Sequence, residues 1–184
     1  MKLNKIALTV ATLVATSALS TFAMSDDNGE IRFTGQVVNS PCNIEADSLK
    51  QEISFGQLSR AALEAGAASE KDITIKLKDC NFNEFSKDGE DKWVAVKDMK
   101  ITFGGKQYAG KDKEFLDVSG TASNIGIQIK NFKFDEAKSI MNQIRNQKGE
   151  NVLEFTAQTK IVDSAAPVTE GDFSSIADFK IAYE

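Results

Sequence analysis

The two cysteines are the residues best suited to chemistry in this 184-residue chain. Cys42 and Cys80 are the whole cysteine count, and the sequence has no histidine that could act as a base or as a third metal ligand. A reactive thiol or a metal pair is therefore disfavoured. The N-terminus indicates export, and a disulfide is the expected state of two cysteines in an exported protein. In the loop-entropy model, closing a loop of this length contributes about 4 kcal/mol.

Carboxylates are the other groups that could bind or catalyse. The acidic segment 81–92 invites a calcium site, but counting from Asn81, Phe85 takes the third ligand position and Ser86 the position that requires glycine. A solvated turn around 88–89 is favoured instead. No spacing singles out a pair of carboxylates for hydrolysis, and no glycine loop is suited to phosphate. We predict no catalytic residue, no metal and no cofactor, and the chain is not expected to be an enzyme.

The first 23 residues have the composition of a secretory signal peptide. Lys2 and Lys5 precede an apolar run over 6–19, and small residues follow at the positions that a signal peptidase inspects. A membrane anchor is the alternative, but the run is too short. The leader holds two lysines and no acid, so its removal changes the formal charge from −5 to −7. Lysines and acids alternate in the remainder, which argues against nucleic acid or anionic lipid as a partner.

Alternating apolar and polar residues predict an all-β domain of short strands. Two stretches stay ambiguous, since 59–66 fits a short helix or a crossing loop, and 134–147 has helical spacing but also fits a loop. Gly104–Gly105 is expected to close a tight hairpin. Strands are expected within the segments 52–58, 72–80, 93–108, 114–118, 121–132, 152–162 and 171–184. Such a series with one disulfide indicates an immunoglobulin-like sandwich.

The segment 29–42 is the one on which the organisation of the chain depends. Ile31, Phe33 and Val37 alternate, and Gly35 holds the remaining position in the same phase, so one face of an extended strand would be apolar. The polar residues before it suggest an arm that leaves its own domain. No residues follow 171–184 to form a closing strand, so we expect a sandwich with one vacant strand position and an arm with an unburied face.

A family resemblance is carried by motifs that recur in order along the whole chain. They are G-x-I-x-F-x-G-x-V-V and a cysteine in 29–42, F-G at 55–56, I-x-I-x-L-x-D-C at 73–80, A-x-N-I-G-I-Q-I at 122–129, L-x-F-x-A at 153–157 and G-x-F-x-x-x-A-x-F-x-I-x-Y at 171–183. Together they resemble the pilin subunits of chaperone–usher fimbriae, of the type 1 and P pilus kind. Thr159 departs from the family, which often has an aromatic residue there, and 134–147 replaces a strand-and-turn region.

The resemblance implies an incomplete immunoglobulin-like fold that lacks its last strand and is completed by strand addition. Residues 24–36 would form a donor arm and 37–184 the pilin domain, with Ile31, Phe33, Gly35 and Val37 as donor residues. The acceptor edge would include Phe173, Phe179, Ile181 and Tyr183. A periplasmic chaperone would bind first, and assembly at an outer-membrane usher would join copies of the chain, other pilins or a tip adhesin into an extracellular fimbria.

Two other hypotheses compete with that of a pilin subunit. The N-terminal strand could pair within its own chain, which would make an ordinary secreted sandwich. The chain could also be a stand-alone carbohydrate-binding adhesin, but Trp93 and two tyrosines offer few aromatic platforms, and tip adhesins carry a further receptor domain. The choice between a major shaft subunit and a minor adaptor stays open at this stage.

Overall fold

The computed structural model describes residues 29–184, so the expected signal peptide and the first residues of the arm lie outside the described range. The chain divides into two units, one ending at Val37 and the other spanning Val38–Glu184. The second unit holds all the helices and strands of the described residues. No helix among the described residues is long and apolar enough to span a membrane.

The larger sheet of the 38–184 unit has six antiparallel strands. Its centre is β2 paired with β11, and this ladder runs from Asn81↔Lys148 to Ser69↔Thr159 with one irregularity near Gly149. Alternate residues of these two strands are buried, which is the pattern that the sequence predicts. The strands, in spatial order, are β1 (Asn43–Ile44), β2 (Ser69–Asn81), β11 (Lys148–Ile161), β9 (Ile125–Ile129), β7 (Phe115–Leu116) and β6 (Tyr108–Ala109).

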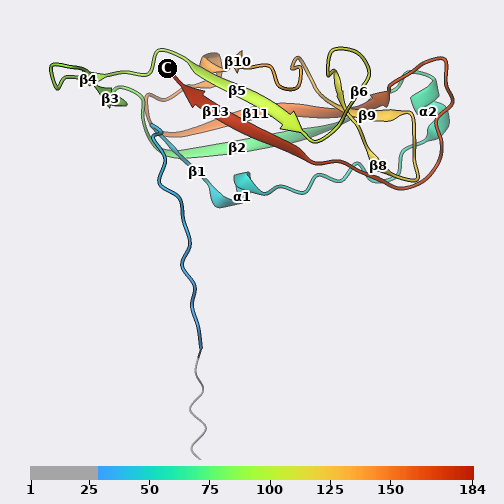
Figure 1. Ribbon diagram of the computed structural model, residues 1–184, viewed down its shortest axis with the longest axis horizontal. Coiled ribbons are helices and arrows are strands. Elements are labelled where there is room, and N and C mark those ends of the chain that lie inside the picture. Colours follow the sequence, from blue (N-terminus) through green and yellow to red (C-terminus); the bar gives the residue numbers. More distant parts are fainter. Residues whose placement is uncertain (1–28) are drawn as a thin grey trace, which may run out of the picture. The chain divides into compact units, whose positions relative to one another are not determined.

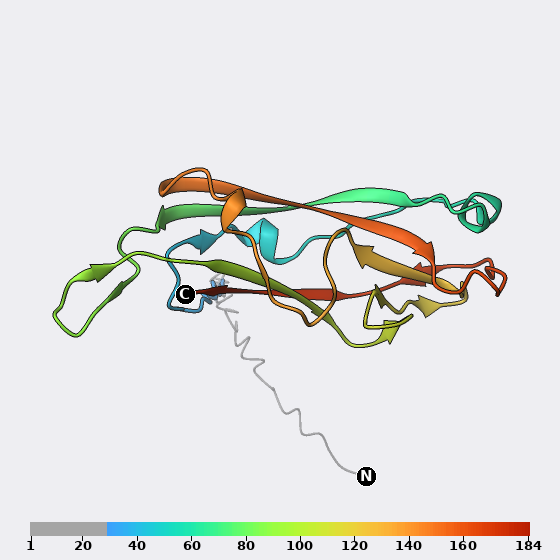
Figure 2. The ribbon, with the colours of Figure 1, turned by 90° about the horizontal axis from the view of Figure 1, so that it is seen from above.

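A three-stranded sheet forms the second layer, in the order β10 (Lys138–Ser139), β5 (Met99–Gly105) and β13 (Ala177–Tyr183). Figures 1 and 2 show β5 and β13 on one side of the domain and β2 and β11 on the other. The remaining elements are short. They are the pairs β3 (Ser86–Lys87) with β4 (Trp93–Val94) and β8 (Ser119–Gly120) with β12 (Phe173–Ser174), the helices α1 (Ala46–Leu49) and α2 (Arg60–Glu64), and the 3-10 turn η1 (Met141–Gln143).

The core lies between the two sheets. Ile75 and Leu153 of the larger sheet and Met99 and Ile101 of the smaller one are fully buried in a single hydrophobic cluster. Phe103, Phe132 and Phe155 meet edge to face, with ring centroids 5.1 to 5.5 Å apart. The all-β sandwich predicted from the alternation is thereby confirmed.

Two local expectations are corrected by the structure, and two open choices are decided. The segment 134–147, left open between a helix and a loop, forms β10 and η1, because Asp135 has a φ of 61°, which interrupts a helix, and residues 138–139 pair with β5. Segment 52–58 contains no strand. Gly104–Gly105 closes no hairpin but lies within β5, where a Cβ on Gly104 would stand 2.8 Å from the Asp178 carboxylate. In the ambiguous 59–66 segment, the helix α2 forms, and the Ser59 side chain caps its first turn.

Candidate functional site

The last strand, β13, lies at the edge of the smaller sheet. It pairs with β5 in a register that runs from Ala177↔Gly105 to Tyr183↔Met99. Within residues 29–184, no other strand pairs with β13, so the backbone groups on its outer side have no ladder partner there. Such an edge is a template for another strand.

The register identifies which backbone groups point outward from β13. Glu184 and Asp98 exchange two hydrogen bonds, of 2.9 and 3.1 Å, directly after the ladder ends. In an antiparallel pair, hydrogen-bonded positions alternate with positions whose backbone groups point away. The N–H and C=O groups of the even-numbered residues of β13 therefore face β5. Those of Phe179, Ile181 and Tyr183 face the open side.

The side chains of these same three residues point into the sandwich but are incompletely covered. Phe179, Ile181 and Tyr183 are half-buried against the main core, whereas Asp178, Lys180 and Ala182 between them are exposed. Burial raises the pKa of the Tyr183 hydroxyl above its ordinary value. The edge strand β13 therefore presents unpaired backbone groups together with an apolar inner face that lacks a neighbour.

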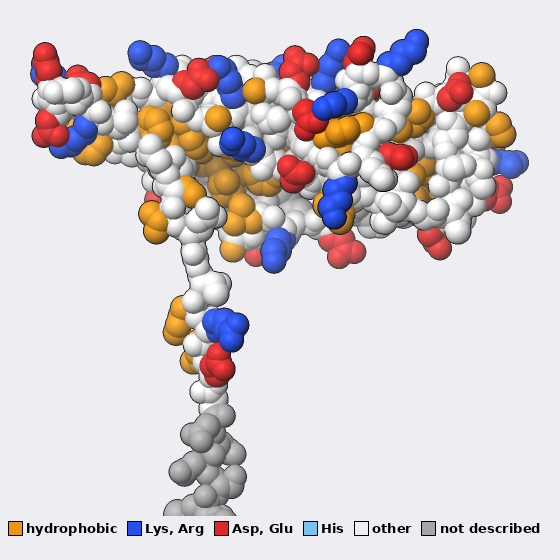
Figure 3. Space-filling view, viewed as in Figure 1, with side chains coloured by type: hydrophobic (Ala, Val, Ile, Leu, Met, Phe, Trp, Pro, Cys, Tyr) orange, Lys and Arg blue, Asp and Glu red, His pale blue; other side chains and the backbone are white. Residues whose placement is uncertain are grey.

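The first part of the domain lies across from the unpaired side of β13. Ile44 of β1, at the edge of the larger sheet, and Phe55 are half-buried against the same core. The Phe55 ring lies 6.3 Å from that of Phe173, and the Phe85 ring lies 6.0 Å from that of Tyr183. Figure 3 shows hydrophobic side chains gathered on the face where β13 and β1 lie. We call β13 and these half-buried apolar residues, Ile44, Phe55, Phe173, Phe179, Ile181 and Tyr183, the open edge.

The structure brings the four predicted acceptor residues together at the open edge. Ile44 and Phe55, its further members, were missed from the sequence. The alternation of Ile53 and Phe55 was visible in the sequence, but no local pattern places it across from β13.

The four predicted donor residues lie in no strand. Ile31, Phe33 and Val37 are 78%, 88% and 101% exposed, and nothing lies within 4 Å of the position that a Cβ on Gly35 would take. An alternating apolar face of this kind is stable in water only when a partner covers it. The arm thus has an unburied apolar face, and the domain has an open edge.

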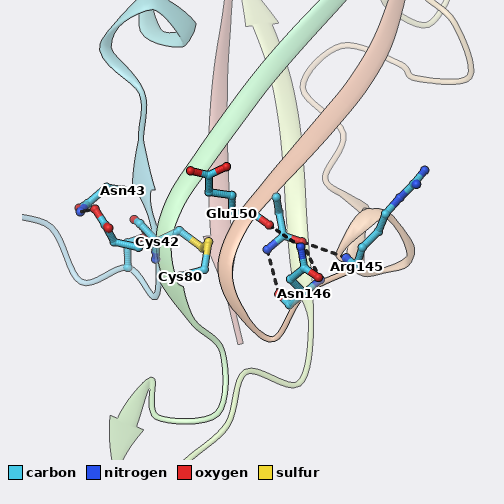
Figure 4. Close-up of a disulfide and its surroundings, with 9 residues drawn as sticks. Cys42, Asn43, Cys80, Arg145, Asn146 and Glu150 are labelled. Carbon is cyan, nitrogen blue, oxygen red and sulfur yellow. Dashed lines mark hydrogen bonds between the residues drawn. A yellow bond between two sulfur atoms is a disulfide. The ribbon is translucent and has the colours of Figure 1, made fainter.

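The predicted disulfide joins Cys42 and Cys80, and both residues are buried (Figure 4). It links the chain just before β1 to the end of β2. Beside it, the Asn81 N–H donates to the Pro41 carbonyl over 2.8 Å. The neighbouring turn is held by Asn151, whose side chain accepts from two backbone N–H groups and donates to a carbonyl. The start of the domain is therefore tied covalently to the end of β2.

The described residues contain no group of three or more histidine, cysteine or acidic side chains that could hold a metal ion. What the site offers is a row of backbone donors and acceptors above an apolar surface. This arrangement suits the binding of an extended peptide strand.

Comparison with known proteins agrees with this geometry. Residues 31–184 match the family model described as fimbrial protein. Fimbria A protein of Serratia marcescens is 33% identical over 188 residues that cover all of both chains. The Pap fimbrial major pilin protein of Escherichia coli is 38% identical over 160 residues, which cover 85% of this chain and 84% of that protein. A solved chaperone–usher pilus, studied for the uncoiling of its rod, is 34% identical with a TM-score of 0.66 and covers 86% of this chain and 96% of its own.

Proposed function

Since the chain belongs to the fimbrial protein family and is a structural subunit of an extracellular chaperone–usher pilus, we propose that its copies join by donor-strand exchange. Residues 24–36 of one copy act as the donor arm, and residues 37–184 of another copy supply the acceptor domain. Ile31, Phe33, Gly35 and Val37 enter the open edge as the missing strand of the sandwich.

The open edge is the observation that carries this proposal. It needs a strand with an apolar face of period two, and the arm has such a face. Each large apolar donor residue that becomes buried contributes about 1.5 to 3 kcal/mol. The main-chain ladder adds register and direction. A joint with several such residues dissociates very slowly, as a surface filament requires.

The backbone pattern supports the same choice of donor residues. In an antiparallel pair, residues directly opposite each other point to the same face. The inward-facing residues Phe179, Ile181 and Tyr183 also carry the outward backbone groups. The donor residues that face the core must therefore be those that hydrogen-bond to β13. Ile31, Phe33, Gly35 and Val37 share one phase, so a single arm meets both requirements.

Growth of a filament favours an antiparallel donor. The chain leaves its domain near Pro41, whose carbonyl accepts a hydrogen bond from the Asn81 N–H. Phe85, four residues after Asn81, packs on Tyr183 near the end of β13. Figure 1 shows the C-terminus and the start of β1 at this same end of the domain. A parallel donor would bring the incoming domain to the end that the acceptor's own arm occupies. An antiparallel donor brings it to the Ala177 end, so arm and incoming domain stand at opposite ends.

Before assembly, the open edge needs a temporary occupant. Unpaired backbone groups above an apolar face promote aggregation in a free monomer. A periplasmic chaperone that lends a strand solves this problem, and release at an outer-membrane usher would let the arm of the next copy replace it. Because this chain has both an arm and an open edge, it is extended at both ends. This arrangement suits a shaft subunit or an adaptor and not a terminator.

Deletion of residues 24–36 tests the proposal. The truncated chain keeps the open edge, so it is expected to remain a folded, chaperone-bound monomer that forms no polymer of its own. It should still accept the arm of a full-length copy and thereby end a chain, which appears as a shift toward short ladders on gels run without boiling. Continued polymerisation of the truncated chain alone would rule out the donor role.

A further inference from the structure

The donor segment has a second face, and Val38, two residues past the arm, finds a match on the acceptor. Ile176, immediately before β13, is 73% exposed, and Val38 is 61% exposed. Both belong to the even-numbered series, which points away from the core in β13. An antiparallel donor in the open edge would carry its even-numbered residues on that same outer face. The question is which residues stand opposite each other.

The shared phase of donor and acceptor restricts the register to steps of two residues. One register sets Val38 opposite Ile176. Moving the donor by two residues in one direction sets Val38 opposite Ser174, and moving it in the other direction sets Val38 opposite Asp178. These three registers differ in what they bring together on each face.

On the inner face, the first register pairs a small residue with a larger one at two of the four donor positions, and it sets Phe33 and Ile31 opposite Ile181 and Tyr183. Gly35 lies opposite Phe179, whose ring can fill the space that the glycine leaves, and Val37 lies opposite Ala177. The Ser174 register instead sets Phe33 against Phe179 and Gly35 against Ala177, which crowds one position and leaves a void at the next. The Asp178 register carries Ile31 past the end of β13, so one donor residue loses its place.

On the outer face, the same register is again the best match. It sets Val38 beside Ile176, two exposed apolar side chains that cover each other, and it sets Arg32 beside Ala182. It also sets Glu30 opposite Glu184, whose carboxylate is paired with Lys100 over 2.7 Å and is thereby partly neutralised. The Ser174 register would bring Arg32 directly opposite Lys180, and like charges at this spacing are destabilising. The Asp178 register would press Val38 against a carboxylate.

We propose that the joint between two copies of this chain is fixed in the register that sets Val38 of the donor opposite Ile176 of the acceptor, and Gly35 opposite Phe179. This inference rests on the proposed function and adds to it a specific contact outside the apolar core of the joint. The Val38–Ile176 pair lies on the solvent face, at the end where the incoming domain begins. It acts as a register stop that inner-face burial alone does not supply.

The proposed pair has a geometry that a disulfide can report. Odd-numbered residues hydrogen-bond across the joint, so Val38 and Ile176 form a non-hydrogen-bonded pair, with Cα atoms about 4.5 Å apart. This separation falls within the range that disulfides span. In the full-length chain, Val38→Cys with Ile176→Cys is therefore expected to link neighbouring copies covalently after mild oxidation. The ladder should then survive boiling without reductant and collapse to monomer with it.

The matched control is Val38→Cys with Ser174→Cys, which reports the register shifted by two residues. Val38, Ser174 and Ile176 are all exposed in the monomer, so cysteine at these positions leaves the core unchanged. The proposal expects cross-linked ladders from the Ile176 variant and at least tenfold fewer from the Ser174 variant. Equal linking, preferential linking through Ser174, or intact polymers without any link overturns the register. Loss of polymers in the Ile176 variant alone also counts against it, because the pair is placed where cysteine is tolerated.

The outcome separates the register from the function on which it rests. Donor-strand exchange itself is judged by the arm deletion, in which no cysteine is introduced. Polymers that require residues 24–36 but do not link through Ile176 leave the exchange standing and refute the register. Polymers that form without the arm refute both.

Discussion

Phe179 stands directly opposite Phe103 in the ladder between β13 and β5, yet the two rings are covered to very different degrees. Phe103 is 3% exposed and packs edge to face on Phe132 and Phe155. Phe179 touches the same core but stays half-buried. Since the two residues share one face of one sheet, the difference arises from the missing neighbour on the outer side of β13. The described part of the domain thus lacks a neighbouring strand along the outer side of β13.

The arm gives the first prediction, because its two faces are expected to respond differently to charge. Phe33→Asp places a carboxylate where the donor enters the apolar edge, and burial of an unpaired charge costs several kcal/mol. We expect assembly of this variant to be abolished, while chaperone binding and monomer folding are retained. Thr34→Asp, on the outer face of the same arm, is the control and should assemble within about twofold of the wild type. Electron microscopy and ladder gels check both, and equal assembly of the two variants contradicts the donor phase.

Period-two alternation predicts the central strands of the structure correctly. The strands β9 and β13 lie within the expected segments, and β2 and β11 overlap theirs but begin three and four residues earlier. The alternation identifies them because a strand with one buried face must alternate. The four acceptor residues that the family resemblance implies lie in the last of these segments and stay a prediction. The disulfide was also predicted, since two cysteines in an exported chain leave few alternatives. What local pattern could not supply was the order of strands in each sheet.

The failures share one physical cause, which is that long-range contacts decide short segments. Phe134 and Ile140 have helical spacing, but they reach the core from a turn and from the position directly after β10. The Ile140 N–H donates a hydrogen bond to the Met99 carbonyl. Gly105 resembles a turn residue, but a Cβ there would lie 2.3 Å from Leu116. Glycine is needed at this position for close packing against Leu116. The sequence alone does not distinguish such a glycine from one in a hairpin turn.

A second prediction concerns Thr159, a threonine at the centre of the fold. Its side chain is fully buried in β11, and its hydroxyl has no hydrogen-bond partner among the described residues. An unpaired buried hydroxyl costs about 1 to 3 kcal/mol. Thr159→Val removes the hydroxyl at nearly constant volume and is expected to raise the free energy of unfolding by about 1 to 2 kcal/mol. Urea denaturation measures the change.

Thr156 on the opposite face of β11 supplies the control for this substitution. It is half-buried, and Thr156→Val should change the free energy of unfolding by less than about 0.5 kcal/mol. An unchanged or lowered stability of Thr159→Val, with the control neutral, would mean that the Thr159 hydroxyl is satisfied in solution.

The disulfide gives a third prediction, because it closes the loop between Cys42 and Cys80 and so ties the start of the domain to the end of β2. Cys42→Ser or reduction should lower the free energy of unfolding by about 2 to 5 kcal/mol. The Cys42 and Cys80 side chains are buried, so the loss includes packing as well as chain entropy. Denaturation with and without reductant measures the effect, and the double variant with serine at both positions should match the reduced wild type. A shift below about 1 kcal/mol would show that the loop is held without the bond.

Acid sensitivity is the fourth prediction, and it depends on a polar cluster that ties three strands together. The Asp98 carboxylate accepts one hydrogen bond from the Ser139 hydroxyl and one from the Met99 N–H. Ser139 belongs to β10, which pairs with β5. Lys100 bonds to Glu184 over 2.7 Å just past the end of β13. The hydrogen bond from Ser139 holds the pKa of Asp98 below its ordinary value of 3.8, and the bond to Glu184 raises the pKa of Lys100 above 10.5.

The direction in which stability changes with pH follows from the lowered pKa of Asp98. A carboxyl group whose pKa is depressed by folding stabilises the fold above its unfolded pKa, and this contribution is lost as the pH falls through the folded pKa. We therefore expect the β10–β5–β13 sheet to weaken below about pH 3.8. Asp98→Asn should lower stability at neutral pH and flatten the acid limb of the stability curve. Asp72→Asn, at an exposed carboxylate of β2, should leave that limb steeper than Asp98→Asn does. Urea midpoints between about pH 2.5 and pH 6 measure both variants, and parallel curves for the wild type and Asp98→Asn would exclude Asp98 as the acid-sensitive group.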